Sequence, residues 1–278
     1  MQAILRITRN TAFIVGLMTC CLSVNAQKNE GDWDIYMATY QDGPGSTVFN
    51  KSLKQGAPYS DLPYLLKAGV HFTGCSGEGL PEQERFSKLY EISDSVSAYM
   101  DRLLENRLAG TFTYQCSRTD YYYIKDTANI RKKLEAAFEE HFKGEHLIIE
   151  IKADAEWKAY LEFLYPNEET QDYMENLKVV MRLHNDGDSL KAARQVDHWA
   201  YFANELDREN FRNYVIGKGF KIEEKFKSER ADFSFGLKFS RADKVDINSI
   251  CIVTRDLRQQ AKKFQGDYDG WETFVIQK

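Results

Sequence analysis

Three glycines in one short stretch come closest, by type and spacing, to a known kind of ligand site. Gly74, Gly77 and Gly79 follow a strand-like segment and precede a long helical pattern, which is where backbone N–H groups can bind a phosphate. A phosphate-binding loop also needs a lysine followed by serine or threonine, and these are missing here. The pattern favours a flexible connection, yet this stretch remains the first place to look for a small-ligand or peptide site.

A second candidate is the tyrosine run that follows Arg118. Arg118 could form a stacking surface for a ligand together with Tyr121, Tyr122 and Tyr123. Alternation along a strand places Tyr121 and Tyr123 on one face and Tyr122 on the other. Part of the run is therefore expected in the core. Arg118 itself is expected in a turn, residues 117–119, between two strands.

The histidines do not form a recognisable catalytic or zinc site. Asp197 and His198 are neighbours on an expected strand, so their side chains point to opposite faces and cannot readily form an acid-base pair. A structural or surface role for His198 is the better interpretation. His141 and His146 lack the helical i, i+4 partner that a zinc site of this kind needs.

A polar run near the middle of the chain offers oxygen ligands for calcium. Asn185, Asp186 and Asp188 have suitable side chains, but the run lacks the remaining ligands of a calcium loop and its later bidentate glutamate. We therefore expect a solvated linker here. No catalytic residue, metal ligand or cofactor is predicted anywhere in the chain.

Two aromatic groups near the C-terminus admit two interpretations each. Residues 233–239 place phenylalanines and a leucine on one face of a strand, where RNA-recognition motifs carry stacking aromatics, but a two-layer fold also needs this face for its core. The core interpretation is preferred. Tyr268 and Trp271 either close the core or form an exposed contact patch. Asp269-Gly270 between them suggests a bend or bulge that turns the tryptophan sideways.

The elements that would position these residues follow the order strand, helix, strand, strand, helix, strand, and they do so twice. In the first half an opening hairpin precedes them. The expected elements there are strands at Trp33–Tyr40, Thr47–Leu53, Tyr64–Thr73, Thr111–Cys116, Asp120–Lys125 and Leu147–Ile151, a helix that starts at Pro81 and carries Phe86 to Leu104, and a helix capped by Asp126 or Thr127.

The second half begins with a helix capped by Asn167 and repeats the order. This helix is expected to turn Tyr173, Leu177, Val180, Met181 and His184 to one side. Strands at Arg194–Phe202, Phe220–Lys227, Asp232–Phe239 and Tyr268–Ile276 follow, with helices at Asp207–Lys218 and after the capping residue Asp246. The predicted fold class is α+β, with two tandem ferredoxin-like (βαββαβ) modules in domains 27–166 and 167–278, joined by a helix.

The N-terminus predicts export. Arg6 and Arg9 precede an apolar stretch, and Val24-Asn25-Ala26 offers the residue sizes that a signal peptidase reads. The stretch is too short for a comfortable membrane span. Residues 1–26 are therefore predicted to be a cleaved signal, and the protein is expected to be periplasmic or secreted. A lipid anchor on Cys20 is a less favoured alternative.

The charge is unevenly distributed along the chain. Residues 27–187 contain 18 Lys or Arg against 27 Asp or Glu, whereas residues 188–278 contain 17 against 15. Neither part has the strong basic stripe of a nucleic-acid binder, so a nucleic-acid partner is not expected.

Three cysteines remain after the predicted cleavage: Cys75, Cys116 and Cys251. An odd number argues against a scaffold built on disulfides and leaves at least one free thiol. Cys75 and Cys116 could pair in an oxidising compartment, and the sequence leaves this open. Cys251 lies among isoleucines of an expected helix, where a small buried apolar residue is the preferred interpretation.

Two families resemble parts of this chain. The second module resembles the RraB family, regulators of ribonuclease E activity, over Val196–Phe220 and Leu257–Phe274, where AKKF and YDGW are the most specific pieces. Residues 64–166 resemble an uncharacterised domain family often found before RraB-like modules, through the helix start at Pro81, the Arg118 hairpin and the segment LEFLYP. The RraB resemblance implies a ferredoxin-like fold and inhibition of ribonuclease E by protein contact, without a catalytic site.

The leading hypothesis is an exported, non-enzymatic protein whose modules bind another protein or a peptide. One alternative is an intracellular RraB-type inhibitor of ribonuclease E. Another is a hydrolase or ligand-binding enzyme with its site near the glycine stretch and Arg118. The candidate binding residues are Gly74, Gly77, Gly79, Arg118, Tyr121, Tyr268 and Trp271.

Overall fold

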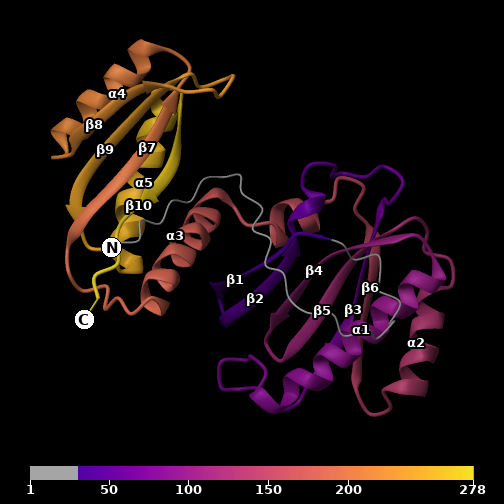
Figure 1. The fold of residues 1–278 in the computed structure, drawn as a ribbon. Coiled ribbons are helices and arrows are strands. Elements are labelled where there is room, and N and C mark those ends of the chain that lie inside the picture. Colours follow the sequence, from indigo (N-terminus) through magenta and orange to yellow (C-terminus); the bar gives the residue numbers. More distant parts are fainter. Residues whose placement is uncertain (1–30, 278) are drawn as a thin grey trace, which may run out of the picture. The chain divides into compact units, whose positions relative to one another are not determined.

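The computed structural model describes residues 31–277, which fall into two compact units (Figure 1). One ends at Asn167 and the other begins at Glu168. The predicted signal, residues 1–26, lies outside the described residues, and so does Cys20. Between residues 31 and 277 no helix is long and apolar enough to cross a bilayer.

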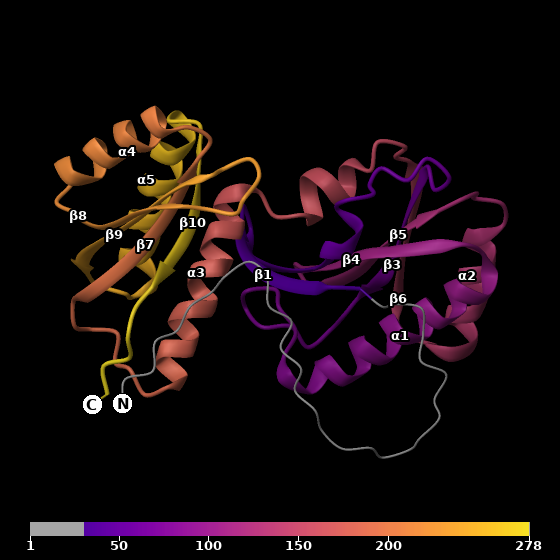
Figure 2. The same ribbon diagram turned by 45° about the horizontal axis from the view of Figure 1, so that its top comes forward.

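The N-terminal unit is built on an antiparallel sheet of six strands in the order β1-β2-β4-β5-β3-β6. The strands are β1 (Trp33–Tyr40), β2 (Gly43–Asn50), β3 (Tyr64–His71), β4 (Asn106–Tyr114), β5 (Ser117–Ile124) and β6 (His146–Ala153). The helices α1 (Phe86–Leu103) and α2 (Ile130–His141) lie on one face of this sheet (Figure 2). The elements from β3 to β6 form a ferredoxin-like arrangement, which the β1–β2 hairpin extends beside β4. The predicted fold class is confirmed.

One core of this unit lies between the helices and the sheet. Leu89, Ile92, Val96 and Met100 recur at steps of three and four along α1 and are all buried. Phe86, the first residue of the α-helix, follows a 3₁₀ turn (Gln83–Arg85). It is partly exposed and stacks on Tyr90.

A second core of aromatic rings covers the opposite face of the sheet. Tyr123 on β5 stacks on Trp157, with ring centroids 3.7 Å apart, and Tyr121 stacks on Phe163 at 6.0 Å. Phe163 belongs to a short π-helical turn, Ala159–Leu164. The sheet is therefore covered on both faces, and Tyr121 is buried rather than available at the surface.

The turn between β4 and β5 lies at Gln115 and Cys116, not at residues 117–119 as predicted. Both residues have left-handed backbone, with φ of 47° and 55°. Turns of this kind favour asparagine and glycine, so these residues gave little signal. Because β5 already begins at Ser117, Arg118 lies within the strand, opposite Thr113.

Cys75 and Cys116 form a disulfide. It joins the loop between β3 and α1 to the β4–β5 turn. The backbone N–H of Cys116 also donates to the carbonyl of Gly79 at 2.8 Å. Cys251, in the helix α5 (Ile247–Lys263), carries a free, half-buried thiol.

Loss of this disulfide is expected to destabilise the N-terminal unit by about 3 kcal/mol, because the bond closes a long loop in the unfolded chain. The two cysteines are 41 residues apart in sequence. Denaturant unfolding of Cys75→Ser/Cys116→Ser measures the effect, and Cys251→Ser is the matched control. A double variant as stable as the control variant would contradict the expectation.

The C-terminal unit is built on an antiparallel sheet of four strands in the order β10-β7-β9-β8. The strands are β7 (Arg194–Phe202), β8 (Lys221–Lys227), β9 (Phe235–Asp243) and β10 (Gly266–Glu272). The helices α4 (Glu205–Gly217) and α5 (Ile247–Lys263) lie on one face of the sheet (Figure 2). This is the second ferredoxin-like module. We call it the C-terminal module.

The core of the C-terminal module fills the space between the sheet and these two helices. Leu237 and Phe239 on β9 are fully buried against Phe211 of α4 and Leu257 of α5. Phe235, Leu237 and Phe239 therefore pack in the core, as preferred from the sequence, whereas Phe233 precedes the strand.

The helix α3 (Glu168–Asn185) precedes the repeat and packs onto the C-terminal module. Val179, Val180 and Leu183 join a cluster with Ile250 and Trp271. The predicted inward face of α3 is partly wrong, since Tyr173 and Met181 are 43% and 54% exposed. The polar side chains that take their place are Asp172 and Asn176, both buried.

Asp188 does not belong to a solvated linker, contrary to the prediction. Its carboxylate and the guanidinium of Arg194 form a buried ion pair. Asp188 also accepts hydrogen bonds from the backbone N–H groups of Leu190 and Ile276, at 2.7 and 2.8 Å. The run from Asn185 therefore ends at a buried carboxylate that connects β7 to the C-terminal tail.

Candidate binding cleft

A cleft of about 410 Å³ lies in the C-terminal module, between α3, α5 and β10. The helix α3 supplies Glu168, Asp172, Glu175 and Asn176, α5 supplies Arg258 and Lys262, and β10 supplies residues 267–271. The YDGW motif at residues 268–271 therefore forms one wall of the cleft. We call it the α3–β10 cleft.

A β-bulge shapes the wall that β10 contributes. The pairing with β7 shifts register between Tyr268 and Gly270, which leaves Asp269 as the extra residue. Gly270 has φ of 135°, a conformation that disfavours any side chain, and it faces open space. The predicted bulge at Asp269-Gly270 is present.

The floor of the cleft is a chain of hydrogen bonds between buried side chains. The indole N–H of Trp271 donates to Asn176 Oδ1 at 2.7 Å, and the amide of Asn176 donates to Thr254 Oγ1 at 2.8 Å. The Thr254 hydroxyl in turn donates to Asp172 Oδ2 at 3.0 Å. These bonds join α3, α5 and β10.

Arg258 binds the same carboxylate from the open side of the cleft. Its Nη2 lies 2.8 Å from Asp172 Oδ1 and 3.7 Å from Glu175, and its Nη1 donates to the carbonyl of Tyr268 at 3.2 Å. The lining as a whole has five carboxylates against three cationic side chains. The α3–β10 cleft is therefore polar and locally acidic, although the part of the chain after residue 188 has a slight excess of Lys and Arg.

The two aromatic residues of the motif are buried rather than exposed. Tyr268 is 2% exposed and Trp271 6% exposed, so only their edges reach the cleft. The Tyr268 hydroxyl makes a 2.8 Å hydrogen bond with Nδ1 of His198. His198 is itself fully buried, and its neighbour Asp197 on the other face of the sheet pairs with Lys238.

Because of His198, the stability of the C-terminal module is expected to decrease as the pH is lowered. Burial, with a smaller contribution from the charge of Arg241, lowers the pKa of His198 to about 3. The unfolded chain takes up a proton below about pH 6.5 that the folded module does not accept until about pH 3. Between these limits stability should fall by about 1.4 kcal/mol per pH unit as the pH decreases.

Denaturant unfolding at several pH values between 6 and 4 tests this expectation. The slope due to His198 should be absent from His198→Leu, whereas His184→Gln, a change at an exposed histidine of α3, serves as the control. Equal slopes in the wild type and in His198→Leu would contradict the assignment.

The glycine stretch lies outside the α3–β10 cleft. Gly74 and Gly79 have φ of 74° and 79°, and a side chain on Gly79 would meet the backbone of Gln115. The disulfide and the Cys116–Gly79 hydrogen bond hold this stretch against the β4–β5 turn. Gly77 has open space around it, and a binding role for the three glycines stays a prediction.

Arg118 and Tyr121 do not form a common stacking surface, contrary to the prediction. Because they are an odd number of residues apart on one strand, their side chains lie on opposite faces of the sheet. Arg118 lies over the ring of Tyr90 on α1, at 5.0 Å, and donates to Ser93 and Thr113. Tyr121 belongs to the aromatic core on the other side.

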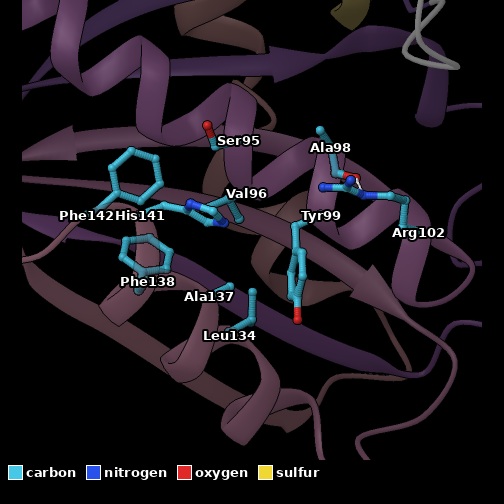
Figure 3. Close-up of a pocket in the computed structure, with 10 residues that line it drawn as sticks. All are labelled: Ser95, Val96, Ala98, Tyr99, Arg102, Leu134, Ala137, Phe138, His141 and Phe142. Atoms are coloured by element: carbon cyan, nitrogen blue, oxygen red, sulfur yellow. Dashed lines mark hydrogen bonds between the residues drawn. The ribbon is translucent and has the colours of Figure 1, made fainter.

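A smaller hollow of about 250 Å³ lies between α1 and α2 (Figure 3). Its walls include Val96, Leu134, Phe138 and Phe142, which are already buried core residues, and Tyr99 and His141 lie beside it. The hollow is a surface groove above the core that lies between these helices and the sheet. Among residues 31–277, no group of three or more His, Cys, Asp or Glu side chains is placed to hold a metal ion.

Fold and cleft together define a class: a protein of two ferredoxin-like modules, the second of which forms a polar cleft with the helix that precedes it. The model of the family Regulator of ribonuclease activity B matches the C-terminal module, over residues 174–273. The model of a family of unknown function (DUF695) matches the N-terminal unit, over residues 31–165.

Other comparisons add little. No curated protein matches the chain. A crystal structure of an unknown protein from Galdieria sulphuraria is similar over 77% of this chain and 97% of its own, at 14% identity and a TM-score of 0.21. A TM-score this low supports no argument about fold or function.

Sequence reasoning missed the contribution of α3 to the cleft. The family match begins inside α3, and Asp172 and Asn176 are four residues apart, on the face that also carries Val179, Val180 and Leu183. Two polar residues that share the helical spacing of an apolar face indicate a buried hydrogen-bond network.

Proposed function

We propose that this is an exported, non-enzymatic protein whose C-terminal module binds a cationic segment of a partner protein in the α3–β10 cleft. The observation that carries the proposal is the excess of carboxylates in the lining. Glu168 and Glu175 on α3 have side chains that are 75% and 64% exposed, so they can meet a partner. Complementary charge of this kind speeds association and selects basic partners.

The family description supports regulation by protein contact as the mode of action. It names a regulator of ribonuclease activity, and regulators of this kind act by binding. The cleft lies where the module's YDGW motif meets α3, so the residues of the family resemblance and the acidic lining coincide.

Site-specific cross-linking tests the cleft. A photoreactive residue at position 175 should give one discrete cross-linked partner, and the same residue at position 140 on α2, which is equally accessible, should not. Glu168→Lys combined with increased salt should reduce the yield from position 175 severalfold. Equal cross-linking from the two positions would reject the cleft as the binding site.

The disulfide supports export, because disulfides form and persist in oxidising compartments. Cell fractionation with N-terminal sequencing decides the question. The expected result is a mature chain that begins near Gln27 in the exported fraction. Recovery of intact Met1 in the cytosol would reject export.

The RraB resemblance implies a second candidate, an intracellular inhibitor of ribonuclease E, and the family description names a regulator of ribonuclease activity. Purified protein added in equimolar amounts to ribonuclease E distinguishes the two proposals. Inhibition of the nuclease would favour the second candidate, and unchanged cleavage is expected under the first.

A further inference from the structure

The loop between β8 and β9 bonds to the strand that forms one wall of the α3–β10 cleft. This loop, residues 228–234, places the guanidinium of Arg230 between two carboxylates of β10. Nη1 of Arg230 lies 3.2 Å from Asp267, and Nη2 lies 2.5 Å from Asp269. Both aspartates are also among the residues that line the cleft.

An aromatic ring completes the surroundings of this guanidinium. The central carbon of Arg230 lies 3.9 Å from the ring centroid of Tyr201, which projects from β7 on the face of the sheet opposite the helices. Two carboxylates and an aromatic face are the partners that a guanidinium binds best, because it is planar, weakly hydrated and always charged. The three residues together are suited to an arginine side chain.

The side chain of Arg230 ties this loop to β10. Hydrogen bonds within the loop join Ser228 to Ser234, Arg230 to Ser228, and Phe233 to Arg230. The side chain of Arg230 is about one third exposed. A competing arginine could therefore replace it without any change in the core.

We propose that Asp267, Asp269 and Tyr201 form a binding site for an arginine side chain of the partner, and that Arg230 occupies this site while the partner is absent. The inference rests on the proposed function, since Asp267 and Asp269 belong to the strand that forms one wall of the cleft. Arg230 neutralises two of the five carboxylates of the lining and so weakens the attraction of the cleft for cations. A partner must displace Arg230, and the loop is released when it does.

Peptide titration of the full-length mature protein tests the inference. The probe is a blocked hexapeptide with two arginines, and its twin has two lysines. Arg230→Ala should bind the arginine peptide about tenfold more tightly than the wild type, and Asp269→Asn in the same background should abolish the gain. The lysine peptide should gain less affinity, because an ammonium group cannot bind two carboxylates in the way that a planar guanidinium does.

Arg241→Ala is the matched control. Arg241 is likewise held by a carboxylate, that of Asp243, and by an aromatic ring, that of Phe220, but it does not line the cleft. Its removal should leave peptide binding unchanged. Arg230→Gln repeats the main test with a smaller change in volume, in case the alanine variant alters the fold.

The outcomes separate this inference from the proposed function. Equal affinity of the wild type and both Arg230 variants would overturn the inference and leave the cleft as a site for cations. Absence of peptide binding to every variant would overturn the proposed function as well.

Discussion

Trp271→Ala is expected to lower the stability of the C-terminal module by about 4 to 5 kcal/mol. The indole is buried in a cluster that joins α3, α5 and the sheet, and removal of a core tryptophan costs about 3 to 5 kcal/mol. The change also leaves Asn176 without the indole N–H that donates to its oxygen, which adds the cost of an unsatisfied buried group. Denaturant unfolding followed by circular dichroism measures the loss.

Two further variants separate packing from hydrogen bonding at Trp271. Trp271→Phe keeps most of the apolar surface and should lose less than half as much stability. A double-mutant cycle with Asn176→Ala should show coupling of about 1 kcal/mol between the two side chains. A loss below 1 kcal/mol for Trp271→Ala would mean that α3 is not held by this residue.

Asp188→Ala is expected to cost about 4 kcal/mol, because it leaves the Arg194 guanidinium buried without its partner. The carboxylate also holds the backbone of Ile276, and Arg194 donates to the carbonyl of Phe274 at 3.2 Å. The C-terminal tail should therefore loosen together with the loop before β7. Thermal unfolding and the rate of carboxypeptidase digestion measure the two effects.

The pH dependence of this ion pair has a definite sign. Although burial alone would raise the pKa of Asp188, the Arg194 guanidinium and the two backbone N–H groups lower it to about 2. An aspartate in the unfolded chain titrates near pH 4, so the stabilisation is complete above that value and is lost as the pH falls from about 4 to about 2.

Asp186→Ala is the control for Asp188→Ala. Asp186 is exposed, directly follows the end of α3 and lies 4.0 Å from Arg182 on that helix. Such surface pairs contribute less than about 0.5 kcal/mol. Comparable losses in the two variants would contradict the assignment of a buried pair.

Much of the fold could be predicted because local patterns and tertiary contacts agree. The strand Arg194–Phe202 and the N-cap Asp246, whose side chain accepts from the N–H of Ser249, lie where the sequence places them. Two of the errors fall at left-handed residues. The turn at Gln115-Cys116 was one, and α2 was another: it begins after Asn129, with φ of 57°, rather than at a cap formed by Asp126 or Thr127.

The cleft could be predicted only in part. The YDGW motif and its bulge were identified from the residues, but the side chains opposite them come from a helix about 90 residues earlier in the sequence. A buried Asp172 and Asn176 contradict the apolar periodicity on which helix faces are predicted. Their partners, Thr254 and Arg258, become apparent only when α3 and α5 are brought together.

The bulge in β10 also limits how any other chain can approach this edge of the sheet. An edge strand normally presents a regular row of N–H and C=O groups that a strand from another molecule can continue. Here Asp269 interrupts that row, and the aspartates on either side of Tyr268 add charge to it. The bulge and the aspartates therefore disfavour strand addition at β10, and copies of the module are not expected to join edge to edge here.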